Sequence, residues 1–279
     1  MAQRRPAFRL SSMLVLLPLL FALLACGAET DSDTEPPQPA AAPPPEAAAT
    51  PETAPAGPPW TRLAPPPGLA ERRLNAGFLI VDGVYNTELT APFDIFQHVQ
   101  YHAKPGIEVF TVSPDGEAVT TFEGLVIGAD YSFENAPDID ILVVPSAEHS
   151  MDTDLENEAM MSWVRKVGER AHFLVSLCDG AFVLAHAGLL DGLASTTFPG
   201  DQDRYAEMFP HLDLRRGVSF VHDGKAITSW GGARSFDPAM YLADHLYGEK
   251  ATQGIGRGMV IPWPPTAETM PAIVIEPTP

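Results

Sequence analysis

Residues 173–192 read FLVSLCDGAFVLAHAGLLDG. The first five form a continuous apolar run, which is typical of a buried parallel strand, and Gly180 permits a sharp turn into a helix over 181–190. A cysteine between such a strand and such a helix, here Cys178, resembles a nucleophile elbow with sulfur in place of a hydroxyl. The alternative is an inert core cysteine that happens to end a strand. The pattern favours an α/β fold with a thiol at the edge of its sheet.

The elbow would give the Cys178 thiol a particular environment. The N-terminus of the following helix stabilises a thiolate, and the backbone N–H of Asp179 is placed to bind a developing oxyanion. The Asp179 carboxylate opposes ionisation of the thiol. We expect the helix dipole to prevail, so that Cys178 reacts with iodoacetamide at pH 7 faster than free cysteine does.

Short apolar runs alternate with helix-period segments through the rest of the folded part. The runs predict strands at 76–81, 107–112, 125–127, 140–144, 173–177, 218–221 and 226–228, and helices over 89–103, 156–170, 181–190 and 237–247. This alternation predicts one α/β domain over 74–261, with a doubly wound, mostly parallel sheet sandwiched by helices.

The N-terminus has the features of a bacterial lipoprotein signal. Arginines precede an apolar run over 13–24, and the run ends in Leu-Leu-Ala before Cys26. We expect residues 1–25 to be a signal peptide and Cys26 to carry a lipid that anchors the chain in the cell envelope, facing the periplasm. The alternative is an ordinary secretory signal with a chance cysteine, and the choice between inner and outer membrane stays open.

Proline and alanine dominate residues 26–73, which predicts an extended, disordered tether. A chain beginning near Arg73 is therefore expected to unfold at the same midpoint as one beginning at Gly27. Residues 262–279 are again proline-rich and predict a loose tail.

The composition of the chain limits the kinds of partner and cofactor that we expect it to bind. A formal net charge of −19 argues against nucleic acid. The chain has two cysteines, and if one carries lipid then Cys178 has no partner for an intramolecular disulfide. No histidine pair forms a metal-ligand motif, and we expect no cofactor.

Three segments carry a resemblance to a known family: CDGAFVLAHAGLLDG from Cys178, the Ala-Ser-Thr-Thr that begins at Ala194, and ELTAPFD from Glu88. They resemble the DJ-1/PfpI superfamily, near the branch with isocyanide hydratases and the amidotransferase-like domains of AraC-type regulators. The similarity covers nearly all of 76–260. It implies a flavodoxin-like fold, a homodimer and a small-molecule ligand or substrate.

The resemblance also implies a site. An acid after the first strand, Glu88 by motif position, hydrogen-bonds the cysteine sulfur and is expected to be protonated. The alternative is an exposed acid at a helix start. The family's Pro-Gly-Gly loop reads Pro-Ser-Ala here, and the Ala147 N–H is expected to help bind an oxyanion. Many relatives place a histidine where this chain has Phe198, and His149 is the best substitute.

Two functions remain open at this point. One is a cysteine-dependent hydrolase, hydratase or glyoxalase-like enzyme acting through Cys178 and Glu88. The other is a non-catalytic ligand-binding or redox-sensing module in which Cys178 is oxidised reversibly.

Overall fold

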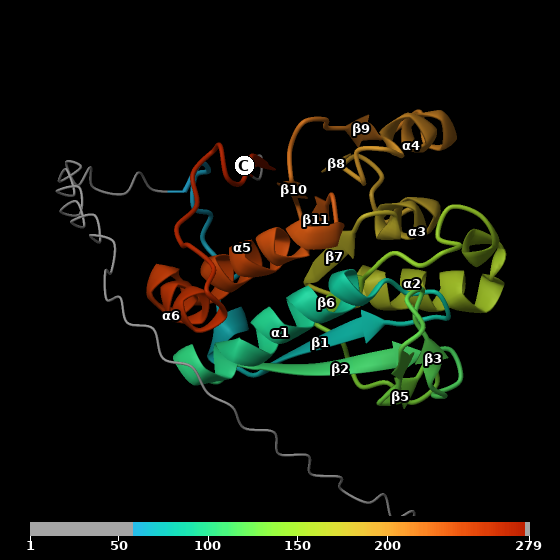
Figure 1. The fold of residues 1–279 in the computed structure, drawn as a ribbon, viewed down its shortest axis with the longest axis horizontal. Helices are drawn as coiled ribbons and strands as arrows, with labels where there is room; N and C mark the ends of the chain where they lie inside the picture. The colour runs from blue at the N-terminus through green and yellow to red at the C-terminus, as the bar shows by residue number, and fades with distance from the viewer. Residues whose placement is uncertain (1–57, 277–279) are drawn as a thin grey trace, which may run out of the picture. The chain divides into compact units, whose positions relative to one another are not determined.

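The computed structural model describes residues 58–276, and an eight-stranded sheet organises them (Figure 1). The strand order is β12-β10-β11-β7-β6-β1-β2-β5. Within this sheet β10 runs antiparallel to β11, and the other neighbouring strands pair in parallel. The strands are β1 (Leu74–Leu79), β2 (Ile107–Ser113), β5 (Tyr131–Ser132), β6 (Ile141–Val144), β7 (Phe173–Leu177), β10 (Phe220–Asp223), β11 (Ala226–Ser229) and β12 (Ala272–Val274).

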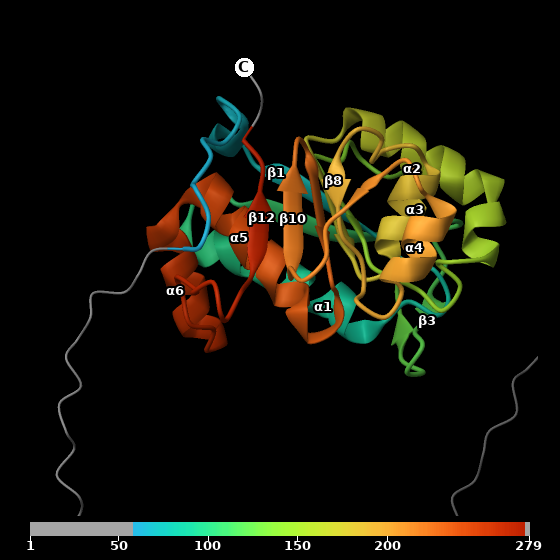
Figure 2. The same cartoon turned by 90° about the horizontal axis from the view of Figure 1, so that it is seen from above.

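Helices cover both faces of the sheet, which confirms the doubly wound α/β fold (Figure 2). One layer contains α1 (Asn86–His102), α5 (Phe236–Tyr247) and α6 (Glu249–Met259); the other contains α2 (Glu158–Arg170), α3 (Gly180–His186) and α4 (Gln202–Met208). Successive strand residues face opposite layers, so Phe78 packs in one core and Leu79 in the other.

Smaller elements complete the described part. They are the 3-10 helices η1 (Leu69–Glu71), η2 (Thr153–Glu156) and η3 (Gly232–Ser235), and the paired short strands β3 (Val119–Thr120) with β4 (Val126–Ile127) and β8 (Ala194–Ser195) with β9 (Asp213–Leu214). The run at 125–127 therefore lies in a small hairpin outside the main sheet. The helix expected over 181–190 ends at His186, and Gly188 follows in the left-handed region at φ 76°.

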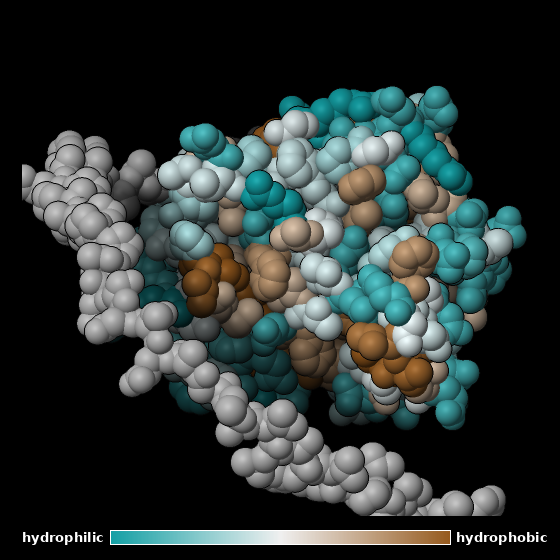
Figure 3. Space-filling model, in the orientation of Figure 1, coloured by the Kyte–Doolittle hydropathy of each residue, from teal (hydrophilic) through white to brown (hydrophobic). Residues whose placement is uncertain are grey.

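The β3–β4 hairpin carries exposed apolar side chains, Phe122, Leu125 and Val126. The space-filling view shows apolar surface at this corner of the molecule (Figure 3). The Phe122 ring packs 4.6 Å from the ring of Tyr85, which precedes α1. The hairpin thus brings an apolar surface beside the start of α1.

Residues 58–73, which we call the strap, pack on the domain. Trp60 is 9% exposed, and its ring lies 5.6 Å from Phe220, 5.2 Å from Tyr241 and 5.9 Å from Trp263. Arg62 Nε donates to Asp244 Oδ2 at 2.9 Å. The expectation that the disordered tether runs to residue 73 is therefore wrong for its last part.

The segment after residue 261 is also part of the fold. Met270 is buried, and β12 pairs in parallel with β10 at the end of the sheet. The expected loose tail is wrong for residues 262–276, because they supply an edge strand and one side of the Trp60 cluster.

The predicted signal peptide and Cys26 lie outside the described residues. Within residues 58–276 no helix combines the length and apolar character needed to cross a membrane.

Trp60→Ala is expected to lower the free energy of unfolding by about 3 kcal/mol, since it removes a buried aromatic side chain with three aromatic neighbours. Urea titration of the mature chain measures the change. Tyr101→Ala, at a side chain that is 72% exposed, is the matched control and should change little. Equal unfolding midpoints for Trp60→Ala and the unaltered chain would show that the strap does not stabilise the domain.

Candidate functional site

Cys178 lies on a strained turn between β7 and α3. Its φ is 52°, a left-handed value that costs a non-glycine residue roughly 1–3 kcal/mol. A Cβ at Gly180 would lie 2.0 Å from the Val144 carbonyl oxygen, and one at Gly231 would lie 2.4 Å from the Cys178 Cβ. The Cys178 N–H donates to Ser229 O at 3.0 Å. The elbow geometry expected from the sequence is present, held between the ends of β6 and β11.

Glu88 reaches this turn from the first turn of α1. Its side chain is 4% exposed, which excludes the exposed-acid alternative. Oε2 accepts from the Ser146 N–H at 3.0 Å and the Ser146 hydroxyl at 2.8 Å, and Oε1 accepts from the Gly232 N–H at 3.1 Å. Burial raises the pKa of the Glu88 carboxyl, and hydrogen bonds from Ser146, Gly232 and the Cys178 thiol oppose that rise. Hydrogen bonds from Ser146 and Gly232 therefore hold the Glu88 carboxyl in a fixed position near Cys178.

Asp179 brings a second buried carboxyl to the sulfur. Its Oδ2 lies 3.7 Å from the Cys178 Sγ, within hydrogen-bonding reach of sulfur, and its Oδ1 accepts from the Thr197 hydroxyl at 3.1 Å. Burial, with the nearby charge of Asp201, raises the pKa of Asp179 to about 7. This carboxyl therefore gains and loses a proton near neutral pH.

The same surroundings hold the thiol protonated. Burial raises the pKa of Cys178 well above its usual range, and the charges of Glu88 and Asp179 raise it further. The Ser146 hydroxyl and the Asp179 N–H act in the opposite direction. The expectation of a readily ionised thiol is thus not supported, because burial and the charges of two neighbouring acids outweigh the effect of the α3 N-terminus.

Two residues proposed from the sequence do not take the expected places. The Ala147 N–H donates to Ser150 Oγ at 2.8 Å, so it already has a partner and is not free for an oxyanion. The His149 side chain is about half exposed, and its Nδ1 lies 3.3 Å from Asp152 Oδ1. No hydrogen bond joins His149 to Cys178 in the described part of the chain, so it does not replace the missing histidine.

Two hydroxyl residues at the site, Ser146 and Thr197, were not predicted from the sequence. The Ser146 hydroxyl donates to Glu88, and Ser146 also lowers the pKa of the Cys178 thiol. The Thr197 hydroxyl lies within hydrogen-bonding distance of Asp179 Oδ1 and of the Cys178 carbonyl oxygen, at 3.1 and 3.0 Å. Both residues come just after short strands, β6 and β8, and a polar residue directly after a strand is the sequence feature that could have indicated them. Across residues 58–276 there is no group of three His, Cys, Asp or Glu side chains arranged for a metal ion.

The chain is similar to several known proteins. The model of the DJ-1/PfpI family matches residues 75–243. Isonitrile hydratase of Pseudomonas putida is 29% identical over 209 residues, which cover 73% of this chain and 87% of that protein. The HTH-type transcriptional regulator CdhR of Pseudomonas aeruginosa is 29% identical over 150 residues, 54% of this chain and 44% of the regulator.

The fold has counterparts among solved structures. The crystal structure of Drosophila melanogaster DJ-1beta superposes with a TM-score of 0.60 and 20% sequence identity, covering 68% of this chain and all of that one. At this identity the likeness shows the fold.

Asp179→Asn is expected to stabilise the protein at pH 8 by up to about 4 kcal/mol and to have no effect near pH 4. Because the folded-state pKa of Asp179 lies above the unfolded value, ionisation favours the unfolded chain. That cost is absent below about pH 4, grows up to about pH 7 and is constant above it. Denaturant unfolding at both pH values measures it, with Glu207→Gln at an exposed acid of α4 as the control. A stabilisation of equal size at both pH values would contradict a raised pKa.

Proposed function

Because the chain belongs to the DJ-1/PfpI family, we propose that its domain is a cysteine-dependent enzyme that adds water to a small molecule with a polarised carbon–nitrogen multiple bond. The observation that carries the proposal is the placement of the Cys178 sulfur between two buried carboxyl groups of raised pKa, Glu88 and Asp179. The Asp179 carboxyl, with a pKa of about 7, exchanges a proton near neutral pH, which suits acid–base work beside a nucleophile. The similarity to an isonitrile hydratase supports this substrate class.

The proposed reaction begins with a neutral thiol. The ionised Asp179 carboxylate accepts the thiol proton while sulfur forms a bond to the substrate carbon, and the proton then passes to the substrate. Water adds to the same carbon, the carbon–sulfur bond breaks and the sulfur recovers a proton. The net change is the addition of one water molecule. Glu88 holds the sulfur and relays protons, and the Asp179 N–H directs a backbone dipole at the reacting end of the thiol.

Asp179 takes the role that a histidine has in many relatives. Phe198 stands at that position, and its hydrocarbon side chain cannot act as a base. A carboxyl whose pKa is about 7 is about as basic in its ionised form as an imidazole. The Thr197 hydroxyl, which donates to Asp179 Oδ1, leaves Oδ2 to face the sulfur.

A second candidate is a ligand-binding module without turnover. Two observations favour it: the Ala147 N–H is already engaged, and HTH-type regulators are among the relatives. The redox-sensing form of this candidate has less support, because the thiolate is the form that attacks peroxide and the surroundings of Cys178 favour the thiol. The homodimer expected from the family stays a prediction.

We also propose that the mature chain is held in the bacterial cell envelope by a lipid on Cys26. The support is the order of the basic residues, the apolar run and the Leu-Leu-Ala-Cys end of that run. The substrate would then be a small molecule that reaches the periplasm.

Incubation of the mature protein with a panel of small isonitriles should yield the matching formamides, detected by NMR. Cys178→Ala should abolish the product, and the rate of the unaltered enzyme should rise with pH through about 7 as Asp179 ionises. Asp179→Asn should be slow and lack that rise. The control is His149→Ala, which should retain the rate, because His149 pairs with Asp152.

Equal turnover in Cys178→Ala would overturn the enzyme proposal. If no isonitrile reacts while one of them raises the thermal midpoint of the protein, the ligand-binding candidate replaces it.

Cys26→Ala should abolish metabolic labelling with palmitate and move the protein from the membrane fraction to the soluble fraction of the producing bacterium. Cys178→Ala is the matched control and should keep both label and location. A Cys26→Ala chain that still carries lipid would refute the anchor.

A further inference from the structure

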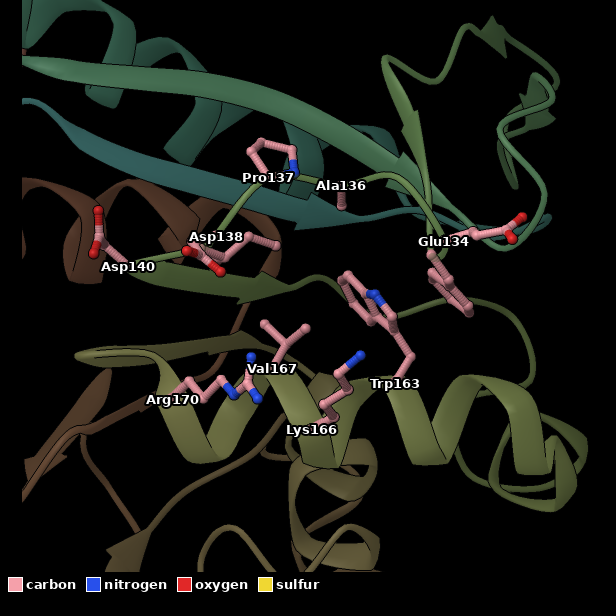
Figure 4. A pocket seen from close by; sticks show the side chains of 11 residues that line it. Glu134, Ala136, Pro137, Asp138, Asp140, Trp163, Lys166, Val167 and Arg170 are labelled. Carbon is pink, nitrogen blue, oxygen red and sulfur yellow. The ribbon is translucent and has the colours of Figure 1, made fainter.

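A cavity of about 390 Å³ opens between α2 and the loop that leads into β6 (Figure 4). Its volume is in the range of small-molecule sites. Residues at its wall include Phe133, Asp138 and Ile139 from the loop and Trp163, Lys166 and Arg170 from α2. The loop residues precede the amino end of β6, whereas Cys178 follows the carboxyl end of β7, its parallel neighbour. The cavity and the cysteine site therefore lie at opposite ends of the parallel strands.

One part of the wall is apolar and planar. The rings of Phe133 and Trp163 stack with centroids 4.5 Å apart and an interplanar angle of 13°. Trp163 and Ile139 are buried, so these side chains hold fixed positions at the cavity. Val167 lies between the two cations of α2 and continues the apolar surface (Figure 4).

The other part of the wall carries excess positive charge. Lys166 and Arg170 are one helical turn apart and reach from α2 toward the loop (Figure 4). Neither forms an ion pair with any residue in the range 58–276. Like charges four residues apart repel each other on a helix, and a bound anion would relieve that repulsion.

The acids near the cavity do not neutralise this pair. The Asp140 carboxylate accepts from Arg72 Nη1 at 2.8 Å and from the Asn75 N–H at 2.9 Å, so it is engaged elsewhere. The Glu134 carboxylate points away from the cavity (Figure 4). Asp138 alone among the three points across the cavity toward α2 (Figure 4), and one carboxylate opposes two cations.

We propose that this cavity is a binding site for a small organic anion with a planar apolar body, such as an arene carboxylate. The carboxylate lies between Lys166 and Arg170, where both donate charge-assisted hydrogen bonds, and the ring lies against Trp163 and Val167. Asp138 faces the same space and weakens binding of the anion. The site is independent of Cys178 and of the reaction proposed there.

The test is calorimetric titration of the mature protein with benzoate and with benzamide, its neutral counterpart. Benzoate should bind saturably, benzamide should not, and the Trp163 indole N–H resonance should shift while that of Trp230 stays. The double variant Lys166→Gln/Arg170→Gln should weaken benzoate binding at least about tenfold. Asp138→Asn should tighten it. Lys250→Gln, at an exposed lysine of α6, is the control and should leave it unchanged.

Three results would each overturn the proposal. They are the absence of saturable benzoate binding, equal binding of benzamide, and benzoate binding that the double variant leaves unchanged. All three variants alter exposed side chains, so equal thermal midpoints will show that they remain folded.

Discussion

The left-handed backbone at Cys178 is the constraint on which the site depends. A cysteine at φ 52° is strained, and it persists because the neighbouring strands leave it no other path. A Cβ at Gly180 would overlap the Val144 carbonyl oxygen on one side of the turn, and a Cβ at Gly231 would overlap the Cys178 side chain on the other. Any side chain at either glycine would collide with backbone or with the cysteine itself. The turn thus joins the ends of β6, β7 and β11 into one rigid unit.

That rigidity explains why three acids can share one small space. The thiol and the carboxyls of Glu88 and Asp179 are each largely buried, and burial raises the pKa of all three. The charges of both acids raise the pKa of the thiol further, and the charge of Glu88 raises that of Asp179. The donors around them, Ser146, Thr197 and the Gly232 N–H, provide hydrogen bonds for two carboxyl groups but not enough for two full charges and a thiolate. The surroundings therefore favour the protonated forms of all three groups.

The parts of this architecture set by local pattern could be predicted from the sequence. The apolar run before Cys178, the glycine after it and the periodic segments on either side specify strands, turn and helices through neighbours close in the chain. The position of Glu88 beside the sulfur required the family resemblance, because α1 and β7 are far apart in sequence.

The features that could not be predicted from the sequence are of two kinds. Some depend on contacts between segments that are distant in the chain, and one, the direction of the pKa shift of Cys178, depends on opposing effects whose balance the sequence does not reveal. The strap is rich in proline, which is typical of a disordered tether, yet the ring of Trp60 packs against three aromatic rings, from β10, α5 and the tail. The Ala147 N–H looks free until the Ser150 hydroxyl is placed beside it. For the thiol, the helix dipole and the acids oppose each other, and burial decides between them in favour of the protonated form.

The strap and the tail lie outside the residues that the family model matches, 75–243. They meet each other through the rings of Trp60 and Trp263. Together they surround β10: β12 occupies one edge of that strand, and Trp60 covers the Phe220 side chain. An exposed edge strand offers unpaired N–H and C=O groups to other chains. In the part of the chain that the structure describes, β12 covers the edge of β10 and is itself the end strand of the sheet. The strap and the tail thus extend the sheet and its core, whereas the groups that act on the Cys178 sulfur come from residues inside the family match.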